Sequence, residues 1–396
     1  MPATQGRGCV ADRAGRCEHA PLPLGCAFRR LAAFTAFTSF TSFIRVGACA
    51  APMTFEIATL LAQDALTNGA IYALMALALV LVFAVTRVIF VPQGEFLAYG
   101  ALSLSSLQAG RAPGIIWLLV GLGALTFLFD GAQALRESRR RRLLISAVWN
   151  LAVPLLLAGL ALWLAPRHAP FAAQLLLTVV LVMPMGPMLY RVAYQPIAEA
   201  PVLVLLIVSV AVQLAMSGLG LYFFGAEGSR TPQFSDGALT LGWLRIGAQS
   251  LWVYGCSALL VAALYAFFQR SLYGKALRAT ASNRVGARLS GISATLAGKI
   301  CFLLAALIGV LSGVLIGPIA TIYYDTGFLV GLKGFVGAII GGLVSYPLAA
   351  VGALLVGLLE SYASFYASAY KEVIVFTLII PMLLWRSLAS RRMEEE

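Results

Sequence analysis

The side chains that could do chemistry in this chain are few and widely spaced. Its 396 residues include two histidines, His19 and His168, and six cysteines, none of which forms a C-x-x-C pair or a mixed cysteine and histidine cluster. Zinc sites and Cys–His dyads depend on such groupings. The sequence therefore predicts no metal centre, no bound cofactor and no Cys–His catalytic pair.

The sequence also gives no indication of a nucleotide-binding site or of a hydrolytic active site. A P-loop requires G-x-x-x-x-G-K-[ST], whereas Gly298-Lys299 is followed by Ile300 and lacks the upstream glycine spacing. The chain also lacks paired carboxylates and a Ser–His–Asp set. We therefore expect a protein that is not an enzyme and does not itself bind ATP.

The remaining candidates are charged residues near the ends of long apolar segments. A charge inside a membrane is costly and is usually retained for a task. Interfacial anchoring is the simpler explanation for most of them, but for Lys333 and Glu360 we expect a role in helix packing or gating. The full set is Glu95, Asp130, Asp325, Lys333 and Glu360.

Membrane-spanning helices must position these residues. Hydrophobic residues make up 61% of the chain and charged residues 11%, against roughly 45–50% and about 25% in soluble domains. Lipid solvates an exterior of this kind, whereas water does not. We expect an all-α, polytopic transmembrane helical bundle in a lipid bilayer. The net charge of +12 is assigned to cytoplasmic loops, not to nucleic-acid binding.

Apolar runs of about 17–25 residues predict the membrane crossings. The second, third and last candidates are short enough to be half-buried or re-entrant, so we expect about 8–11 membrane segments. The candidates are Ile57–Thr86, Glu95–Ala109, Ile115–Phe129, Leu143–Ala165, Phe171–Tyr190, Pro201–Phe224, Ser250–Phe268, Gly298–Ala320, Phe328–Val344, Leu348–Tyr366 and Glu372–Trp385.

Positive charge predicts the orientation of these segments. The basic regions 136–142, 270–299 and 386–392 fall on one side, which we take to be cytoplasmic, and the charge-balanced loop 225–249 falls on the other. Residues 53–390 then form the membrane domain, with a cytoplasmic loop at 270–298, and residues 391–396 form a cytoplasmic tail.

Residues 1–52 differ from the rest in composition. They hold four of the six cysteines and no span-length apolar run. We expect this leader to be disordered or not made at all, with Met53 as the true start. A processed leader, suggested by Ala48-Cys49-Ala50, and an interfacial segment are the alternatives.

Glycines recur at helix-packing spacing in the last third of the chain. Gly309, Gly313 and Gly317 lie four residues apart, and Gly337 and Gly341 repeat the spacing. Glycines at this spacing allow helix backbones to approach closely. We expect them to pack the bundle, and sliding of these helices during transport is compatible with the same pattern.

The cytoplasmic stretch 273–299 contains a predicted surface helix, Lys275–Leu289. One face carries small residues that would fit a partner's groove, and cations project elsewhere. Docking to a protein and binding to lipid headgroups remain equally open on this pattern. The small residues are Ala276, Thr280, Asn283 and Ala287, and the cations are Lys275, Arg278 and Arg288.

Four short motifs occur in order between about Leu60 and Ser387. The first is Asn68–Leu74 with Phe90–Glu95; the second is Phe224–Pro232; the third is the spacing of Gly274, Arg278, Ala279, Ala287 and Gly291; the fourth is Gly331–Phe335 with Gly341, Gly342, Gly352, Gly357, Glu360 and Tyr370–Glu372. Together they resemble the LivH-type permease subunits of bacterial ABC importers for branched-chain amino acids. The chain has Pro92-Gln93 where that family has Ala-His.

The resemblance implies an inner-membrane subunit with several partners. These are a second, related permease, two cytoplasmic ATPase subunits that hold a coupling helix, and an extracytoplasmic substrate-binding protein that docks on the outer loop. The implied pathway residues are Asn68, Tyr72, Gln93, Gly94 and Glu95; the coupling residues are Gly274, Lys275, Arg278, Ala279, Ala287, Arg288 and Gly291; the docking residues are Glu227, Gly228 and Arg230; the packing or gating residues are Gly309, Gly313, Gly317, Lys333, Gly341, Gly342 and Glu360.

We therefore expect transport of branched-chain or other hydrophobic amino acids with energy from the partner ATPases. An ion-coupled secondary carrier of small organic solutes is the first alternative. A membrane scaffold or membrane enzyme is the second.

Overall fold

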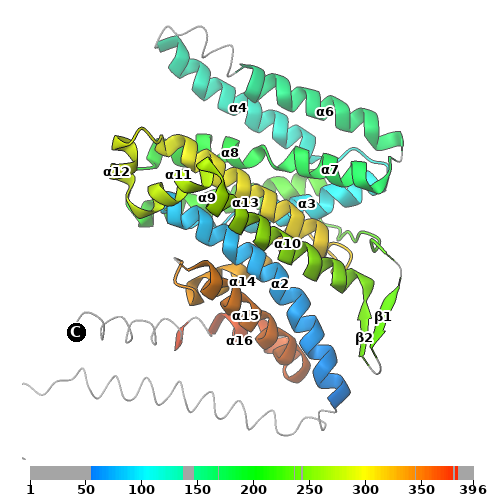
Figure 1. The fold of residues 1–396 in the computed structure, drawn as a ribbon. Coiled ribbons are helices and arrows are strands. Elements are labelled where there is room, and N and C mark those ends of the chain that lie inside the picture. The colour runs from blue at the N-terminus through cyan, green and yellow to red at the C-terminus, as the bar shows by residue number, and fades with distance from the viewer. Residues whose placement is uncertain are drawn as a thin grey trace, which may run out of the picture. The chain divides into compact units, whose positions relative to one another are not determined.

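The computed structural model describes residues 55–136, 147–167, 169–235, 237–241, 244–343, 345–377 and 380–381. The predicted leader 1–52 and tail 391–396 lie outside this range, as do parts of the predicted segments Leu143–Ala165 and Glu372–Trp385. The described residues form a helical bundle with one small β-hairpin (Figure 1). The predicted all-α polytopic class is confirmed.

Helices account for most of the described chain. They are α2 (Phe55–Thr86), α3 (Gln93–Gln108), α4 (Ile115–Arg136), α6 (Val153–Leu164), α7 (Phe171–Val182), α8 (Met185–Leu189), α9 (Val202–Phe224), α10 (Ala248–Arg270), α11 (Leu272–Ser282), α12 (Arg284–Leu289), α13 (Ala294–Ile316), α14 (Thr326–Ile340), α15 (Tyr346–Tyr366) and α16 (Lys371–Thr377). Short π-helical or 3-10 turns cover Val148–Ala152, Ala165–Arg167, Tyr190–Tyr194, Gln195–Ile197 and Ser368–Tyr370.

A two-stranded antiparallel hairpin interrupts this helical pattern. It pairs β1 (Ala238–Leu241) with β2 (Leu244–Gly247) and places Ala238 opposite Gly247. The hairpin precedes α10 at one end, and α11 follows α10 at the other. Twenty-three residues of helix span about 34 Å, so hairpin and α11 lie at opposite ends of the bundle. We call the hairpin end outer and the α11 end inner, following the charge distribution.

Eight helical segments of the described chain are long and apolar enough to cross a membrane. Helices α3 and α14 are shorter, at 16 and 15 residues. The number of long segments is therefore at the lower end of the predicted 8–11, because α3 and α14 are shorter helices and the predicted segment Glu372–Trp385 lies partly outside the described residues.

Helix α2 runs through the centre of the bundle (Figure 1). It packs against α13, α14 and α15, and 78% of its most apolar stretch is buried. The corresponding values for α9 and α10 are 22% and 17%. A helix that is apolar all round belongs in the interior, whereas α9 and α10 offer their apolar surface to lipid.

Helices α4 and α6 form a hairpin at the edge of the bundle (Figure 1). Trp117 on α4 and Trp163 on α6 are exposed, as expected for residues that face lipid or the membrane interface. At one end of α4, Asp130 accepts hydrogen bonds from Arg191 and from Asn150. This polar contact attaches the α4–α6 hairpin to the turn Tyr190–Tyr194.

The chain between α2 and α3 is not helical, and after the exposed Arg87 it is buried or half-buried. After α2 ends, Arg87 adopts a positive φ of 62°, and the segment 87–92 returns into the bundle. Phe90 is fully buried and packs against the rings of Phe96, Tyr194 and Phe302. Non-helical backbone at membrane depth is tolerated where protein covers it. Helix α3 therefore begins inside the bundle and not at a membrane surface.

Candidate functional site

The buried start of α3 carries the first polar site. Glu95 lies in the first turn of α3 with no exposed surface, and Gln213 of α9 donates a hydrogen bond from Nε2 to Glu95 Oε1. The amide of Gln93 points to α13 and donates from Nε2 to the carbonyl of Ala305 over 2.9 Å. Two further buried oxygens, Glu95 Oε2 and Gln213 Oε1, have no hydrogen-bond partner among the described residues. We call Glu95 and Gln213 the α3–α9 pair.

A second buried polar site joins α2, α14, α15 and α16. Lys333 Nζ lies 2.6 Å from Glu360 Oε1 and 3.1 Å from Glu372 Oε1. The Tyr72 hydroxyl donates to Glu360 Oε2 over 2.6 Å. Both oxygens of Glu360 are thus paired, and Lys333 contacts two carboxylates. We call Tyr72, Lys333, Glu360 and Glu372 the ion network.

Helix α14 separates the two polar sites. Its residues Gly327 and Gly331 lie directly against Gly94, and a Cβ at Gly94 would collide with the Gly327 carbonyl. Lys333, two positions further on, is directed instead to α15 and α16. The predicted pathway residues therefore divide into two groups, with Tyr72 in the ion network and Gln93, Gly94 and Glu95 at the start of α3. Asn68 is half-buried on α2 and belongs to neither group.

The predicted packing glycines lie at close helix contacts. Gly309 and Gly313 lie against α3, where Phe96 and Leu97 leave no room for a Cβ. Gly317 faces Thr231 of the outer loop, and Gly341 lies against Ala349 of α15. Gly342 adopts a positive φ of 71° in the turn between α14 and α15. These contacts bring helix backbones together on both sides of α14.

The predicted surface helix Lys275–Leu289 is two helices in the structure. Helix α11 ends at Ser282, and the Asn283 side chain accepts hydrogen bonds from the backbone amides of Val285 and Gly286 to begin α12. An asparagine in this role is a typical N-cap and interrupts the continuous helix that the apolar spacing predicts.

The predicted small-residue face is only partly exposed, since Asn283 is exposed and Ala276 is half-buried. Thr280 and Ala287 are 2% and 5% exposed, because they pack on the chain itself and not outward. The exposed side is apolar and basic instead. Its apolar members are Leu272, Tyr273, Val285 and Leu289, and its cations are Lys275, Arg278 and Arg288. We call this exposed set the inner face.

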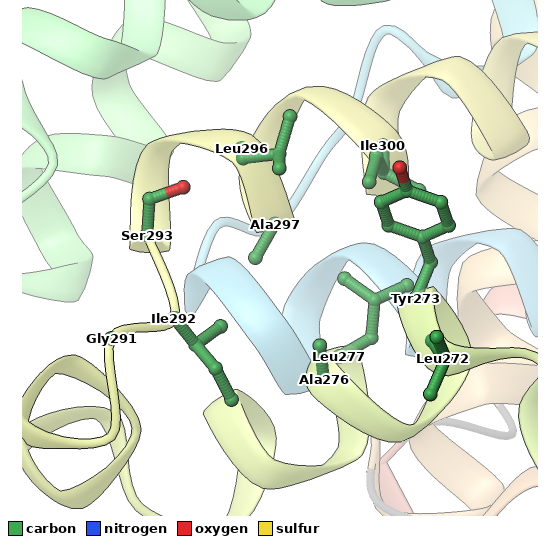
Figure 2. A pocket seen from close by; sticks show the side chains of 10 residues that line it. All are labelled: Leu272, Tyr273, Ala276, Leu277, Gly291, Ile292, Ser293, Leu296, Ala297 and Ile300. Carbon is green, nitrogen blue, oxygen red and sulfur yellow. The ribbon is translucent and has the colours of Figure 1, made fainter.

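An apolar pocket lies behind the inner face. Figure 2 shows it between α11 and the start of α13, with Leu272 and Tyr273 at one end and Gly291 and Ile292 at the other. Its volume is about 260 Å³. The predicted coupling residue Gly291 lines it with a positive φ of 83°, which favours glycine.

The inner face is connected to the central helix. Arg284 of α12 donates from Nε and Nη2 to the carbonyl of Val85, in the last turn of α2, at 3.2 and 3.0 Å. Leu277 of α11 packs with Leu81 and Val85. Desolvation by burial lowers the pKa of the Arg284 guanidinium from its usual value. These contacts join α11 and α12 to the end of α2, the helix that carries Tyr72.

The predicted docking residues of the outer loop lie beside the segment 317–323. Ser229 and Ile322 form an antiparallel bridge, and Arg230 Nε donates to the Pro318 carbonyl over 2.9 Å. Gly228 packs beside the Tyr323 ring, and Glu227 is exposed. The loop is thus a fixed part of the outer surface.

Two residues of the buried polar sites were not predicted from the sequence. Glu372 was part of a motif but received no role, and Gln213 was one residue in a long apolar run. A signal for Gln213 did exist. Ser209, Gln213 and Gly220 are small or polar and fall at helical spacing, and they form part of the buried stripe of α9.

Comparison with known proteins gives one consistent assignment. The family model for the permease component of branched-chain amino acid transport systems matches residues 61–383. The chain is 31% identical over 225 residues to the high-affinity branched-chain amino acid transport system permease protein LivH of Escherichia coli (strain K12), covering 54% of this chain and 71% of that protein. It is 28% identical over 225 residues to the permease protein BraD of Pseudomonas aeruginosa, covering 55% and 72%.

No solved structure matches the chain. The family match extends from α2 into the segment after α16 and so includes both polar sites, the inner face and the outer loop. Together with eight segments able to cross a membrane, it identifies a multi-pass membrane protein. The chain belongs to the family of permease components of branched-chain amino acid transport systems.

Proposed function

We propose that this chain is the membrane-spanning permease subunit of an ABC importer in the inner membrane, and that it moves branched-chain or other hydrophobic amino acids. Energy comes from two cytoplasmic ATPase subunits. A second, related permease and an extracytoplasmic substrate-binding protein complete the assembly. The family assignment does not favour the ion-coupled carrier that the sequence left open.

The observation that carries this proposal is the inner face and its attachment to α2. Leu272 and Leu289 are 82% and 85% exposed on short helices outside the membrane-spanning segments, a costly arrangement unless a partner covers them. The neighbouring cations suit an acidic rim on that partner. The contact of Arg284 with the end of α2 then provides the mechanical link from the ATPase to the pathway.

The two buried polar sites support a pathway that opens and closes around α14. Close glycine contacts such as Gly94 with Gly327 allow helices to shift without repacking large side chains. The ion network gives α14 a defined position against α2, α15 and α16. We assign Asn68, Tyr72 and Gln93–Glu95 to the pathway, and Lys333 and Glu360 to its gating.

The test is copurification of the assembled complex. Val285→Asp with Leu289→Asp places charge at the centre of the inner face, where both side chains are exposed. A charge that is buried in an interface without a partner costs about 3–5 kcal/mol, which corresponds to far more than a tenfold loss of affinity. We expect the ATPase subunits to be lost during purification and ATP-driven leucine uptake into proteoliposomes to fall accordingly.

A matched control introduces the same charge at the outer end. Tyr222 of α9 is 81% exposed, so Tyr222→Asp should leave both ATPase recovery and uptake intact. Ala287→Asp is unsuitable because that position is buried in the chain itself. Full ATPase recovery with the double variant would refute the coupling assignment, and uptake without any ATPase would refute the importer.

A further inference from the structure

We infer that the α3–α9 pair binds the ammonium group of the transported amino acid, and that Gln213 is a specificity-determining residue of the pathway. This inference rests on the proposed function and goes beyond it by naming the ligand chemistry and a residue outside the predicted pathway. The structural basis is a buried carboxylate and a buried amide, each with one acceptor oxygen that has no donor among the described residues.

The two unpaired oxygens belong to side chains that are hydrogen-bonded to each other. Gln213 Nε2 donates to one oxygen of Glu95, which leaves the second carboxylate oxygen and the Gln213 amide oxygen unpartnered among the described residues. Glu95 has no exposed surface and Gln213 has 4%. Leaving buried acceptors unpaired costs free energy, which a ligand that supplies donors recovers.

An ammonium group has the chemistry that this arrangement lacks. It supplies three donors and a positive charge, and it accepts none. A carboxylate ligand would add acceptors where acceptors are already unpaired. Glu95 lies in the first turn of α3, where the helix dipole stabilises its negative charge and so prepares a partner for a cation.

Access to the pair is through the contact between α3 and α9. Helix α9 is buried only along a narrow stripe that contains Leu205, Ser209, Gln213, Met216 and Gly220. Besides the bond from Gln213, the Tyr99 hydroxyl of α3 donates to the Met216 carbonyl, and Ser209 is hydrogen-bonded to the Tyr194 hydroxyl of the turn Tyr190–Tyr194. Little apolar surface is buried there, so α9 can separate from α3 at lower cost than α2 from α15.

The experiment measures equilibrium binding to the purified, nucleotide-free transporter complex in nanodiscs without the binding protein. The competitors are leucine, leucinamide, which keeps the ammonium and loses the carboxylate charge, and 4-methylpentanoate, which lacks the ammonium. We expect the unmodified complex to bind labelled leucine and to lose it to leucinamide but not to 4-methylpentanoate.

Two variants test the residues. Gln213→Leu removes the amide and Glu95→Gln replaces the unpaired carboxylate oxygen with a donor, so each should weaken leucinamide binding at least about tenfold. Gln249→Leu is the matched control. Gln249 is also a buried glutamine, but both ends of its amide are satisfied, by the Leu315 carbonyl and the Phe234 amide. Its replacement should leave ligand selectivity unchanged.

The outcomes separate this inference from the proposed function. ATP-driven leucine uptake by the unmodified complex, measured in parallel, tests the function alone. If the unmodified complex takes up leucine, competition by 4-methylpentanoate as strong as that by leucinamide overturns the ammonium site. Leucinamide binding by Glu95→Gln within twofold of that by the unmodified complex overturns it as well. Because Glu95→Gln preserves size and a hydrogen-bonding partner for Gln213, its loss of binding cannot be ascribed to misfolding if the variant purifies as an intact complex.

Discussion

The two buried polar sites beside α14 contain similar groups but differ in how completely they are paired. In the ion network, Glu360 receives a donor on each oxygen and Lys333 is shared between two carboxylates, so that Glu372 Oε2 is the one buried oxygen of the network without a partner among the described residues. In the α3–α9 pair, one hydrogen bond joins two side chains that each retain an unpaired oxygen. A largely paired network fixes the helices that carry it, whereas a site in which each side chain keeps an unpaired oxygen is suited to a ligand.

The surroundings of the two sites reinforce this difference. The ion network joins helices that pack closely, including α2 and α15, where Gly357 lies against Gly69. The α3–α9 pair instead joins the buried start of α3 to one of the least buried helices of the bundle. The ion network therefore lies in a closely packed part of the bundle, whereas the α3–α9 pair lies at a helix that has little buried surface to lose when it moves.

Removal of the cation from the ion network should have the largest effect on stability. Lys333→Met leaves the Glu360 and Glu372 carboxylates together without a positive charge, which costs about 3–5 kcal/mol when a buried pair is broken. We expect the free energy of unfolding to fall by that amount, measured by sodium dodecyl sulfate titration in mixed micelles.

Lys371→Met is the control for this change. Lys371 begins α16, next to Glu372, and makes no ion pair among the described residues. It should therefore change stability by less than about 0.5 kcal/mol. Equal effects of the two variants would show that the ion network does not hold these helices together.

Removal of one neutral donor should have a smaller effect. Tyr72→Phe deletes the hydroxyl that donates to Glu360 Oε2 and leaves that oxygen unpaired, at a cost of about 1–3 kcal/mol. The same titration measures it. The control is Tyr254→Phe, since that hydroxyl is half-buried and bonds to Thr67 and to the Gln63 carbonyl near the outer end. Tyr254→Phe should cost no more than about 1 kcal/mol, and the prediction for Tyr72 fails if the order is reversed.

The sequence predicted the bundle and the family because both depend on local patterns. Apolar run length predicted most of the long segments, and the start of α3 was predicted at Glu95, two residues after its observed start at Gln93. Pro92 explains that boundary, since a proline fits the first turn of a helix and disfavours helix before it. Motif order predicted Tyr72 and Gln93–Glu95 as a group of interest, although not the two separate sites they occupy.

The remaining features depend on contacts that are distant in sequence. Gln213 lies 118 residues from Glu95, and nothing in an isolated apolar run indicates the direction of one glutamine. The Lys333 to Glu372 contact spans 39 residues and depends on the turn of α16 back toward α14. The break at Asn283 was visible as a capping residue followed by Arg-Val-Gly, but the helical spacing of small residues on both sides suggested a continuous helix.

The same chemical substitution should lower the free energy of unfolding at one site and not at the other. Glu360→Gln replaces one of the two carboxylate oxygens with an NH2 group, which then faces a donor, either Lys333 or Tyr72, and cannot accept from it. The free energy of unfolding should therefore fall by about 1.5–3 kcal/mol. Glu95→Gln instead supplies an amide donor to the unpaired oxygen of Gln213 while its own oxygen still accepts from Gln213 Nε2.

Glu95→Gln should therefore leave stability unchanged or raise it by up to about 1 kcal/mol, the smallest change of the series. Both variants are compared in the same micelle titration, so differences in expression do not enter. A loss of stability in Glu95→Gln as large as in Glu360→Gln would mean that the α3–α9 pair is structural, like the ion network. A stable variant with impaired leucine binding is the expected result, because an unpaired buried carboxylate oxygen reduces stability unless a ligand occupies it.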